Sequence, residues 1–267
     1  METIIFYIMI FCIGTMFGSF FTLAVYRLPL HEDITHERSF CPICNHKLSF
    51  WDMIPILSYI FLGGKCRYCK SKIRPRYLIL EICSGIVFLL MAISICATLP
   101  ITIDKLVYLV LALLYIAGLF IIAGIDKEKV QIHMGVLFYE MIVVAMYMMY
   151  LYILSNVNVY RYVIYLFFLC VLLILETCYL RKNLKSNYTL QILMISLLMI
   201  AFAGRWQFIL TVILTLLSIA IDKAIEKICG RGQNSTKEKS HKIPVAYFMC
   251  VCHIVVLIIM NFIICRW

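Results

Sequence analysis

Apolar residues along this chain gather in long blocks that are separated by short charged segments. Runs of about 20 apolar residues, the length that a helix needs to cross the hydrocarbon core of a bilayer, recur eight times, at 4–26, 77–99, 104–125, 132–154, 159–180, 188–203, 206–222 and 244–265. The sixth and seventh runs are short and are joined by the turn Gly204-Arg205-Trp206. The pattern predicts an all-α integral membrane protein with about eight transmembrane helices.

Basic residues are concentrated on one side of these predicted spans. Of the 24 lysines and arginines, 20 lie in the alternate segments 27–76, 126–131, 181–187 and 223–242. The positive-inside rule makes that side cytoplasmic and puts both chain ends on the outer face. The net charge of +10 therefore reflects membrane topology and gives no reason to expect nucleic-acid binding. With 64% hydrophobic residues and a mean hydropathy of +0.98, the chain is expected to be a multi-pass protein of an inner or cytoplasmic membrane, with the lipid bilayer as its surroundings.

Four of the 13 cysteines lie in the first predicted cytoplasmic loop. Cys41 and Cys44 form one CxxC pair, and Cys66 and Cys69 form a second pair after 21 intervening residues. Four thiolates on two paired turns suit the tetrahedral coordination of a structural zinc ion. The alternatives are four reduced structural cysteines or a redox pair. A site closed by four thiolates would fold the loop and leave no open position for chemistry.

Several segments of the chain resemble the type IV prepilin peptidases. They are GSFFTLAVYRLP (18–29), RSFCPIC (38–44), WDMIPILSYIFLGGKCRYC (51–69), IRPRYLILE (73–81) and IPVAYF (243–248). Members of this family are membrane aspartic proteases that remove the leader of prepilin-like proteins, and bifunctional members also methylate the new N-terminus. The resemblance implies a prepilin-like or pseudopilin-like membrane substrate and, for methylation, S-adenosylmethionine as cofactor. It also implies three parts: a first helix (1–27), a zinc loop (28–76) and a seven-helix peptidase-like domain (77–267).

The family pairs two aspartates, the first in a pattern like D-x6-P-D and the second in G-x-G-D-x-K. Asp126 follows an apolar run and matches the first position, although His133 and Met134 stand where the family has Pro-Asp. The second motif overlays best on residues 186–191, which places Thr189 at the aspartate. A threonine hydroxyl does not ionise near neutral pH and cannot replace a carboxylate.

Other acids could stand in for the missing aspartate. Glu176 and Asp222 lie on the predicted cytoplasmic side, and Glu140 lies inside the fourth apolar run, with Glu176 the first choice as a surrogate. Ordinary pairing at helix ends also accounts for Glu176 and Asp222, and a solvated charge at a helix end accounts for Asp126.

Three functions remain open on the sequence. The chain is a leader peptidase that uses Asp126 and an unrecognised acid, a non-catalytic protein that binds or regulates pilin-like substrates, or a protein that keeps only methyl transfer through the loop from Arg38 to Glu81. If Asp126 has no acidic partner, cleavage should be barely above background.

Overall fold

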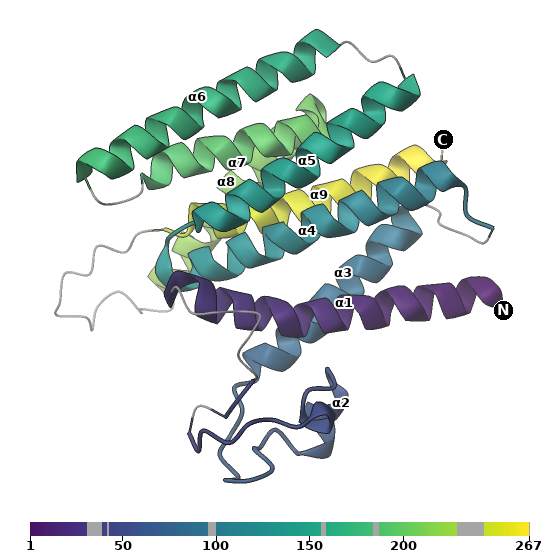
Figure 1. Cartoon of the computed structure of the whole chain (residues 1–267), viewed down its shortest axis with the longest axis vertical. Coiled ribbons are helices and arrows are strands. Elements are labelled where there is room, and N and C mark those ends of the chain that lie inside the picture. The colour runs from purple at the N-terminus through teal and green to yellow at the C-terminus, as the bar shows by residue number, and fades with distance from the viewer. Residues whose placement is uncertain are drawn as a thin grey trace. The chain divides into compact units, whose positions relative to one another are not determined.

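The computed structural model describes residues 1–30, 39–41, 43–95, 100–155, 159–183, 187–228 and 243–266. These residues form nine α-helices (Figure 1): α1 (Glu2–Arg27), α2 (Leu57–Phe61), α3 (Arg76–Ser94), α4 (Ile103–Lys129), α5 (Met134–Ser155), α6 (Val159–Asn183), α7 (Tyr188–Ala203), α8 (Arg205–Ile228) and α9 (Val245–Arg266). The described part of the chain contains no strand, only two isolated β-bridges. Arg38, Ser186 and most of the segment 223–242 lie outside the described residues.

Seven of the helices are long and apolar enough to cross a membrane, and α7, with 16 residues, is a shorter apolar helix. The predicted all-α membrane fold is confirmed. The prediction of two short helices is wrong for α8, which has 24 residues. Hydropathy ends the seventh run at Asp222, whereas good helix formers such as Lys223 and Ala224 continue the helix beyond the apolar part.

The turn between α7 and α8 consists of one residue, Gly204. Its φ of 92° lies in a region that residues with a Cβ atom rarely adopt. A glycine here lets two apolar helices reverse direction without a loop.

The chain divides into two compact units, Met1–Leu113 with Asn261–Trp267, and Leu114–Met260. Helices α4 and α9 contribute residues to both units. The first unit contains α1, the cysteine loop and α3. The second contains α5 to α8 with most of α4 and α9.

Small residues let α1 and α3 pack closely in the first unit. A Cβ on Gly14 would come within 2.8 Å of Gly85 Cα, and a Cβ on Gly18 would come within 2.7 Å of Glu81 Cα. Ser84 Oγ donates a buried hydrogen bond of 2.8 Å to the Gly14 carbonyl. Gly14 and Gly18 thus form a GxxxG contact, the arrangement by which membrane helices approach when no hydrophobic effect drives them together.

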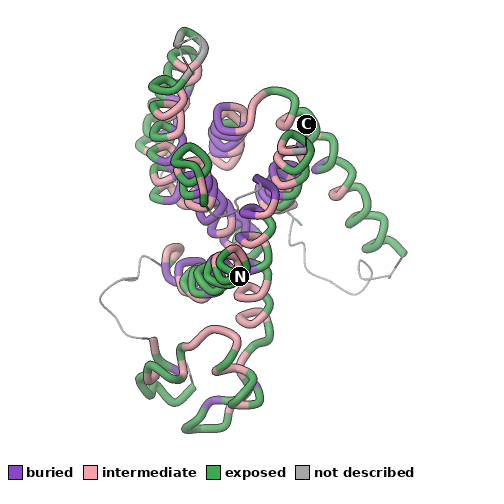
Figure 2. The backbone as a smooth tube through the Cα atoms, turned by 90° about the vertical axis from the view of Figure 1, so that its right-hand side faces the viewer, coloured by how far each residue is buried: buried purple, intermediate pink, exposed green. Residues whose placement is uncertain are grey.

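The second unit is built around α4 and α7. Side chains of α4 such as Leu119, Ile122 and Ile125 are fully buried, as are Met194 and Ile195 on α7, and α7 packs against α5, α6 and α8. Large apolar side chains remain exposed on most other helix faces. Figure 2 shows how buried and exposed positions alternate along the helices. This exposed apolar surface is suited to lipid.

Candidate functional site

The first cysteine pair lies on a tight turn stabilised by backbone hydrogen bonds. The Asn45 N–H donates to the Cys41 carbonyl (2.8 Å), and the Cys41 N–H donates to the His46 carbonyl (3.0 Å). Asn45 has a φ of 54°, which directs the chain back, and a β-bridge between Phe40 and Lys47 closes the turn.

The second pair lies on a turn of the same geometry. The Lys70 N–H donates to the Cys66 carbonyl (3.0 Å), the Cys66 N–H donates to the Ser71 carbonyl (2.8 Å), and Lys70 has a φ of 59°. A β-bridge between Lys65 and Lys72 closes this turn. The two CxxC motifs therefore form matching knuckles.

The two knuckles bring their four sulfur atoms together. The Sγ atoms of Cys41, Cys44, Cys66 and Cys69 all lie within 4.8 Å of one another, and the Cys41 and Cys69 sulfurs are 3.8 Å apart. A tetrahedron with Zn–S bonds of about 2.3 Å has sulfur–sulfur edges of about 3.8 Å. The residues therefore fit a zinc-type ion, and a set of four sulfurs suits a structural metal.

The surroundings of the cluster shift the pKa values of its thiols in opposite directions. Burial acts to raise the pKa of Cys41, but hydrogen bonds, first those from the backbone N–H groups of Cys44 and Ile43, lower it to about 6. The His46 backbone acts to lower the pKa of Cys44, but burial and the neighbouring Cys41 and Cys69 sulfurs raise it to about 11. The Ser71 hydroxyl lies 3.0 Å from Cys69 Sγ and 3.9 Å from Cys41 Sγ. His46 is not a member of the sulfur cluster, and its ring packs against Tyr68 at a centroid distance of 3.5 Å. His46 thus lies beside the cluster and not within it.

Two carboxylates hold the rest of the loop. Asp52 accepts hydrogen bonds from the Ser49 hydroxyl (2.8 Å) and from Arg67 Nε (2.7 Å). Burial acts to raise the pKa of Asp52, but these hydrogen bonds hold it below its usual value. Glu81, on α3, accepts the Ile56 N–H at 2.7 Å, so the loop is anchored to the membrane helix that follows it.

Asp126 lies in the last turn of α4, fully buried. Its Oδ2 atom accepts the Tyr247 N–H at 2.8 Å and the Tyr188 hydroxyl at 3.0 Å. Its Oδ1 atom is buried with no hydrogen-bond partner in the described part of the chain. One end of α4 thus meets the first turns of α7 and α9 through this carboxylate.

Glu176 is also fully buried and contacts the start of α7. Its Oε1 atom accepts the Asn187 N–H at 3.0 Å and the Gln191 side-chain amide at 3.2 Å, whereas Oε2 has no partner among the described residues. A carboxylate at a helix N-terminus satisfies N–H groups that the helix leaves unpaired and complements the helix dipole.

Asp126 and Glu176 therefore contact adjacent residues, Tyr188 and Asn187. No hydrogen bond between the two carboxylates is found within the described ranges. The structure brings both acids to the beginning of α7 and gives each a contact that stabilises a helix end.

The other residues singled out from the sequence lie elsewhere. Thr189 is exposed, and its N–H donates to the Asn187 side chain that caps α7. Asp222 is exposed on α8. Glu140, on α5, is buried against Gly118, and neither of its carboxylate oxygens has a partner in the described part of the structure.

Sequence reasoning missed Tyr188, the side chain that contacts Asp126. It precedes Thr189, the residue overlaid on the family's second aspartate. Its place in that motif indicates that it lies near the first aspartate position. Only a three-dimensional arrangement shows that the phenol of residue 188, and not the hydroxyl of residue 189, reaches α4.

A second cluster of buried polar side chains in the same unit joins α4, α8 and α9. Thr211 Oγ1 lies 3.0 Å from His253 Nδ1, and Tyr115 packs edge-on against the His253 ring at a centroid distance of 5.9 Å. The Tyr115 hydroxyl and His253 Nε2 are buried without partners in the described structure. These side chains fix the packing of α4, α8 and α9.

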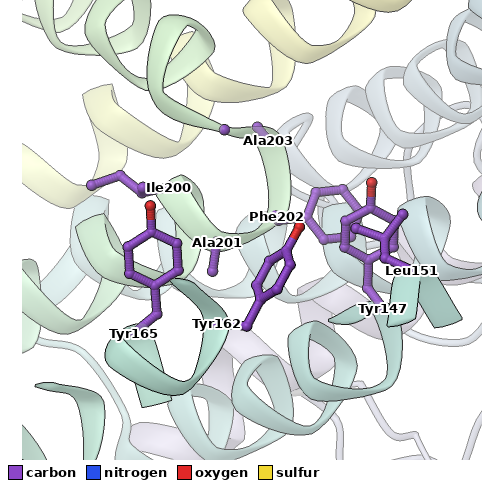
Figure 3. Close-up of a pocket in the computed structure, with 9 residues that line it drawn as sticks. Tyr147, Leu151, Tyr162, Tyr165, Ile200, Ala201, Phe202 and Ala203 are labelled. Atoms are coloured by element: carbon purple, nitrogen blue, oxygen red, sulfur yellow. The ribbon is translucent and has the colours of Figure 1, made fainter. Parts of the chain in front are cut away.

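One cavity of about 170 Å³ in this unit is separate from the acids. It lies at the end of α7 near Gly204, and Tyr147, Tyr162 and Tyr165 form much of its lining (Figure 3). Asp126 and Glu176 contact the opposite end of α7. The lining of the cavity contains no carboxylate.

Comparison with known proteins supports the resemblance in the first part of the chain. Residues 12–95 match the model of the bacterial peptidase A24 N-terminal domain. This range covers most of α1, the cysteine loop and α3, so the zinc-type cluster lies within the matched domain.

The curated relatives of the chain are prepilin leader peptidase/N-methyltransferases. The relative from Vibrio cholerae serotype O1 is 41% identical over 85 residues, which cover 28% of this chain and 34% of the relative. The relative from Klebsiella pneumoniae is 33% identical over 125 residues (45% and 51%), and that from Bacillus subtilis is 39% identical over 79 residues (30% and 32%).

The matched part of this chain spans between a third and half of the length of these relatives. No solved structure matches the chain. In its N-terminal part the chain is therefore similar to the bacterial peptidase A24 N-terminal domain and to prepilin leader peptidase/N-methyltransferases.

Proposed function

We propose that this chain removes the leader of prepilin-like membrane proteins, with Asp126 as the acid that activates water. The proposal is supported by the names of its relatives and by the match of Asp126 to the first aspartate position of the family. The substrate would present a short basic leader on the cytoplasmic side and an apolar helix in the bilayer.

The observation that carries the proposal is the environment of Asp126. One carboxylate oxygen is held by the Tyr247 N–H and the Tyr188 hydroxyl, while Oδ1 faces the buried interior without a partner in the described part of the chain. A general base needs a fixed orientation and one oxygen free to take a proton.

Glu176 is the acid proposed as a surrogate for the second aspartate. Its free Oε2 atom supports this role, whereas the two hydrogen bonds to Oε1 support a structural role at the start of α7. Without a second acid at the reacting centre, general acid assistance of about 10²–10⁴ in rate is absent. Cleavage should therefore be slow compared with that by relatives that keep both aspartates.

The zinc-type cluster has a structural part in this proposal. Cys41, Cys44, Cys66 and Cys69 would hold the ion, and its bonds would fold the segment between α1 and α3. Methyl transfer from S-adenosylmethionine rests on the names of the relatives alone, and no residue of this chain is assigned to it.

The test is cleavage of a prepilin-like leader in membranes that contain the protein and no other leader peptidase. Wild-type protein should release the leader slowly, Asp126→Asn should abolish release, and Glu176→Gln should show whether that acid takes part. Thr189→Ala is a matched control because residue 189 is exposed and the hydrogen bonds found to Asp126 among the described residues come from Tyr188 and Tyr247. Absence of cleavage by the wild type, or cleavage that survives Asp126→Asn, would overturn the proposal.

A further inference from the structure

We propose that the Tyr188 hydroxyl polarises the scissile carbonyl of the substrate, the task that a second aspartate performs in the two-acid mechanism. The inference rests on the proposed leader peptidase function and adds a second catalytic residue to it. It starts from the one side-chain group that hydrogen-bonds Asp126 in the described structure.

The position of Tyr188 is fixed from two sides. Its hydroxyl donates to Asp126 Oδ2 at 3.0 Å and accepts the Ala246 N–H at 3.2 Å. Tyr188 is also the first residue of α7, whose start is capped by the Asn187 side chain through the Thr189 N–H. The phenol therefore lies between the acid and the beginning of α9 without freedom to turn away.

A phenol can stabilise a developing oxyanion where an aliphatic hydroxyl is poorly suited. The phenol is much more acidic than the threonine hydroxyl and donates a stronger hydrogen bond. The Ala246 N–H, by donating to the phenolic oxygen, withdraws electron density and makes its proton a better donor. Placed donors of this kind act strongly in a site that excludes water.

The hydrolysis can be written with these two side chains alone. The Asp126 carboxylate takes a proton from water as the water oxygen forms a bond to the carbonyl carbon. The carbonyl electron pair moves to oxygen, which accepts the hydrogen bond from Tyr188. Asp126, now neutral, no longer competes for that hydrogen. The intermediate then re-forms the carbonyl, the C–N bond breaks, and the proton on Asp126 passes to the departing amine.

Burial of Asp126 fits this exchange. Asp126 is fully buried and the Tyr188 hydroxyl donates to its Oδ2 atom, so a substrate carbonyl that accepts from this hydroxyl takes the place of Oδ2 as its acceptor. Entry of the substrate thus exchanges one acceptor of Tyr188 for another and leaves the contact with Ala246 in place.

The experiment measures kcat and KM for leader cleavage by wild-type protein, Tyr188→Phe and Tyr188→Glu. Removal of an oxyanion donor lowers kcat by about 10²–10³, so Tyr188→Phe should lose kcat by that factor with KM within about two-fold. Tyr188→Glu, which supplies an acidic donor, should be faster than Tyr188→Phe. Tyr139→Phe is the control, since it removes a phenolic hydrogen bond of 2.9 Å to the Leu114 carbonyl within the same unit, away from Asp126.

The results separate the inference from the proposed function. Cleavage by the wild type that Tyr188→Phe leaves unchanged would overturn the role of Tyr188 and leave the peptidase standing. No cleavage by the wild type would overturn both. If Tyr188→Phe unfolds, Tyr188→Glu decides the matter: a folded Tyr188→Glu variant that cleaves no faster than Asp126→Asn would overturn the role of a donor at residue 188, and cleavage above that level would support it.

Discussion

Gly18 is a position where α1 and α3 meet backbone to backbone, and Gly18→Ala tests how much that contact stabilises the protein. A Cβ atom there would lie 2.7 Å from Glu81 Cα and 2.9 Å from the Leu80 carbonyl oxygen, and it would overlap the Ser84 hydroxyl. Carbon atoms in contact prefer about 3.5–4.0 Å. The two helices must therefore separate by about 0.8 Å, because the neighbouring atoms belong mainly to the backbone and cannot turn aside.

The expected loss of stability follows from three contributions. Overpacking of this kind costs about 1–3 kcal/mol. Separation also weakens the 2.8 Å hydrogen bond from Ser84 Oγ to the Gly14 carbonyl, and such bonds between membrane helices contribute about 0.6 kcal/mol on average. Alanine is a better helix former than glycine by up to about 1 kcal/mol. The net effect of Gly18→Ala is a destabilisation of about 1–3 kcal/mol.

The measurement is the free energy of unfolding in mixed detergent micelles, with added SDS as denaturant and helicity as the signal. Met16→Ala is the control, because Met16 lies on the same helix with 64% of its surface exposed and should change the free energy by less than about 0.5 kcal/mol. If Gly18→Ala is as stable as the wild type or more so, the close approach of α1 and α3 does not exist in the membrane.

Two further outcomes concern the loop. Purified protein should contain one zinc ion per chain, and Cys66→Ser should lose it. Cys83→Ser should keep the ion, since Cys83 is an exposed cysteine outside the cluster. Elemental analysis that finds equal zinc in both variants would contradict the site. Asp52→Asn should destabilise the loop at neutral pH, as measured by protease resistance. Because hydrogen bonds hold the pKa of Asp52 below its usual value, the stabilisation is complete above the unfolded value of about 3.9 and is lost as pH falls through the lower folded value. The difference between wild type and variant should therefore persist down to about pH 4, and a difference that closed near neutral pH would refute this account.

The sequence predicts most of the fold because membrane helices leave a strong signal. Nearly every backbone group of a span must be hydrogen-bonded within its helix, so each apolar block becomes one helix, and the cysteine spacing places two knuckles in one loop. Hydropathy predicts an end at Asp222, six residues before the end of α8 at Ile228, because it reports the boundary of the apolar region, whereas a helix can continue into polar residues.

The surroundings of Asp126 could not be predicted in the same way. Position in a motif identifies the acid, but its hydrogen bonds come from Tyr188 and Tyr247, which are far away in sequence and on different helices. Such contacts depend on how α4, α7 and α9 are rotated against one another, and hydropathy patterns carry no information on that rotation. Whether Glu176 acts as an acid or as a helix cap depends on the same arrangement.

The matching knuckles have a consequence for the order of events during synthesis. Cys41 and Cys44 emerge from the ribosome before Cys66 and Cys69, and the second knuckle lies directly before α3. A metal that needs all four sulfurs can be captured only after α1 has been made, so Gly14 and Gly18 first meet lipid and not their partner helix. A metal held by both knuckles would link the segment before α3 to the segment after α1. When zinc is scarce, newly made chains should therefore keep α1 unpaired. Quality-control proteases should cut such chains before they fold.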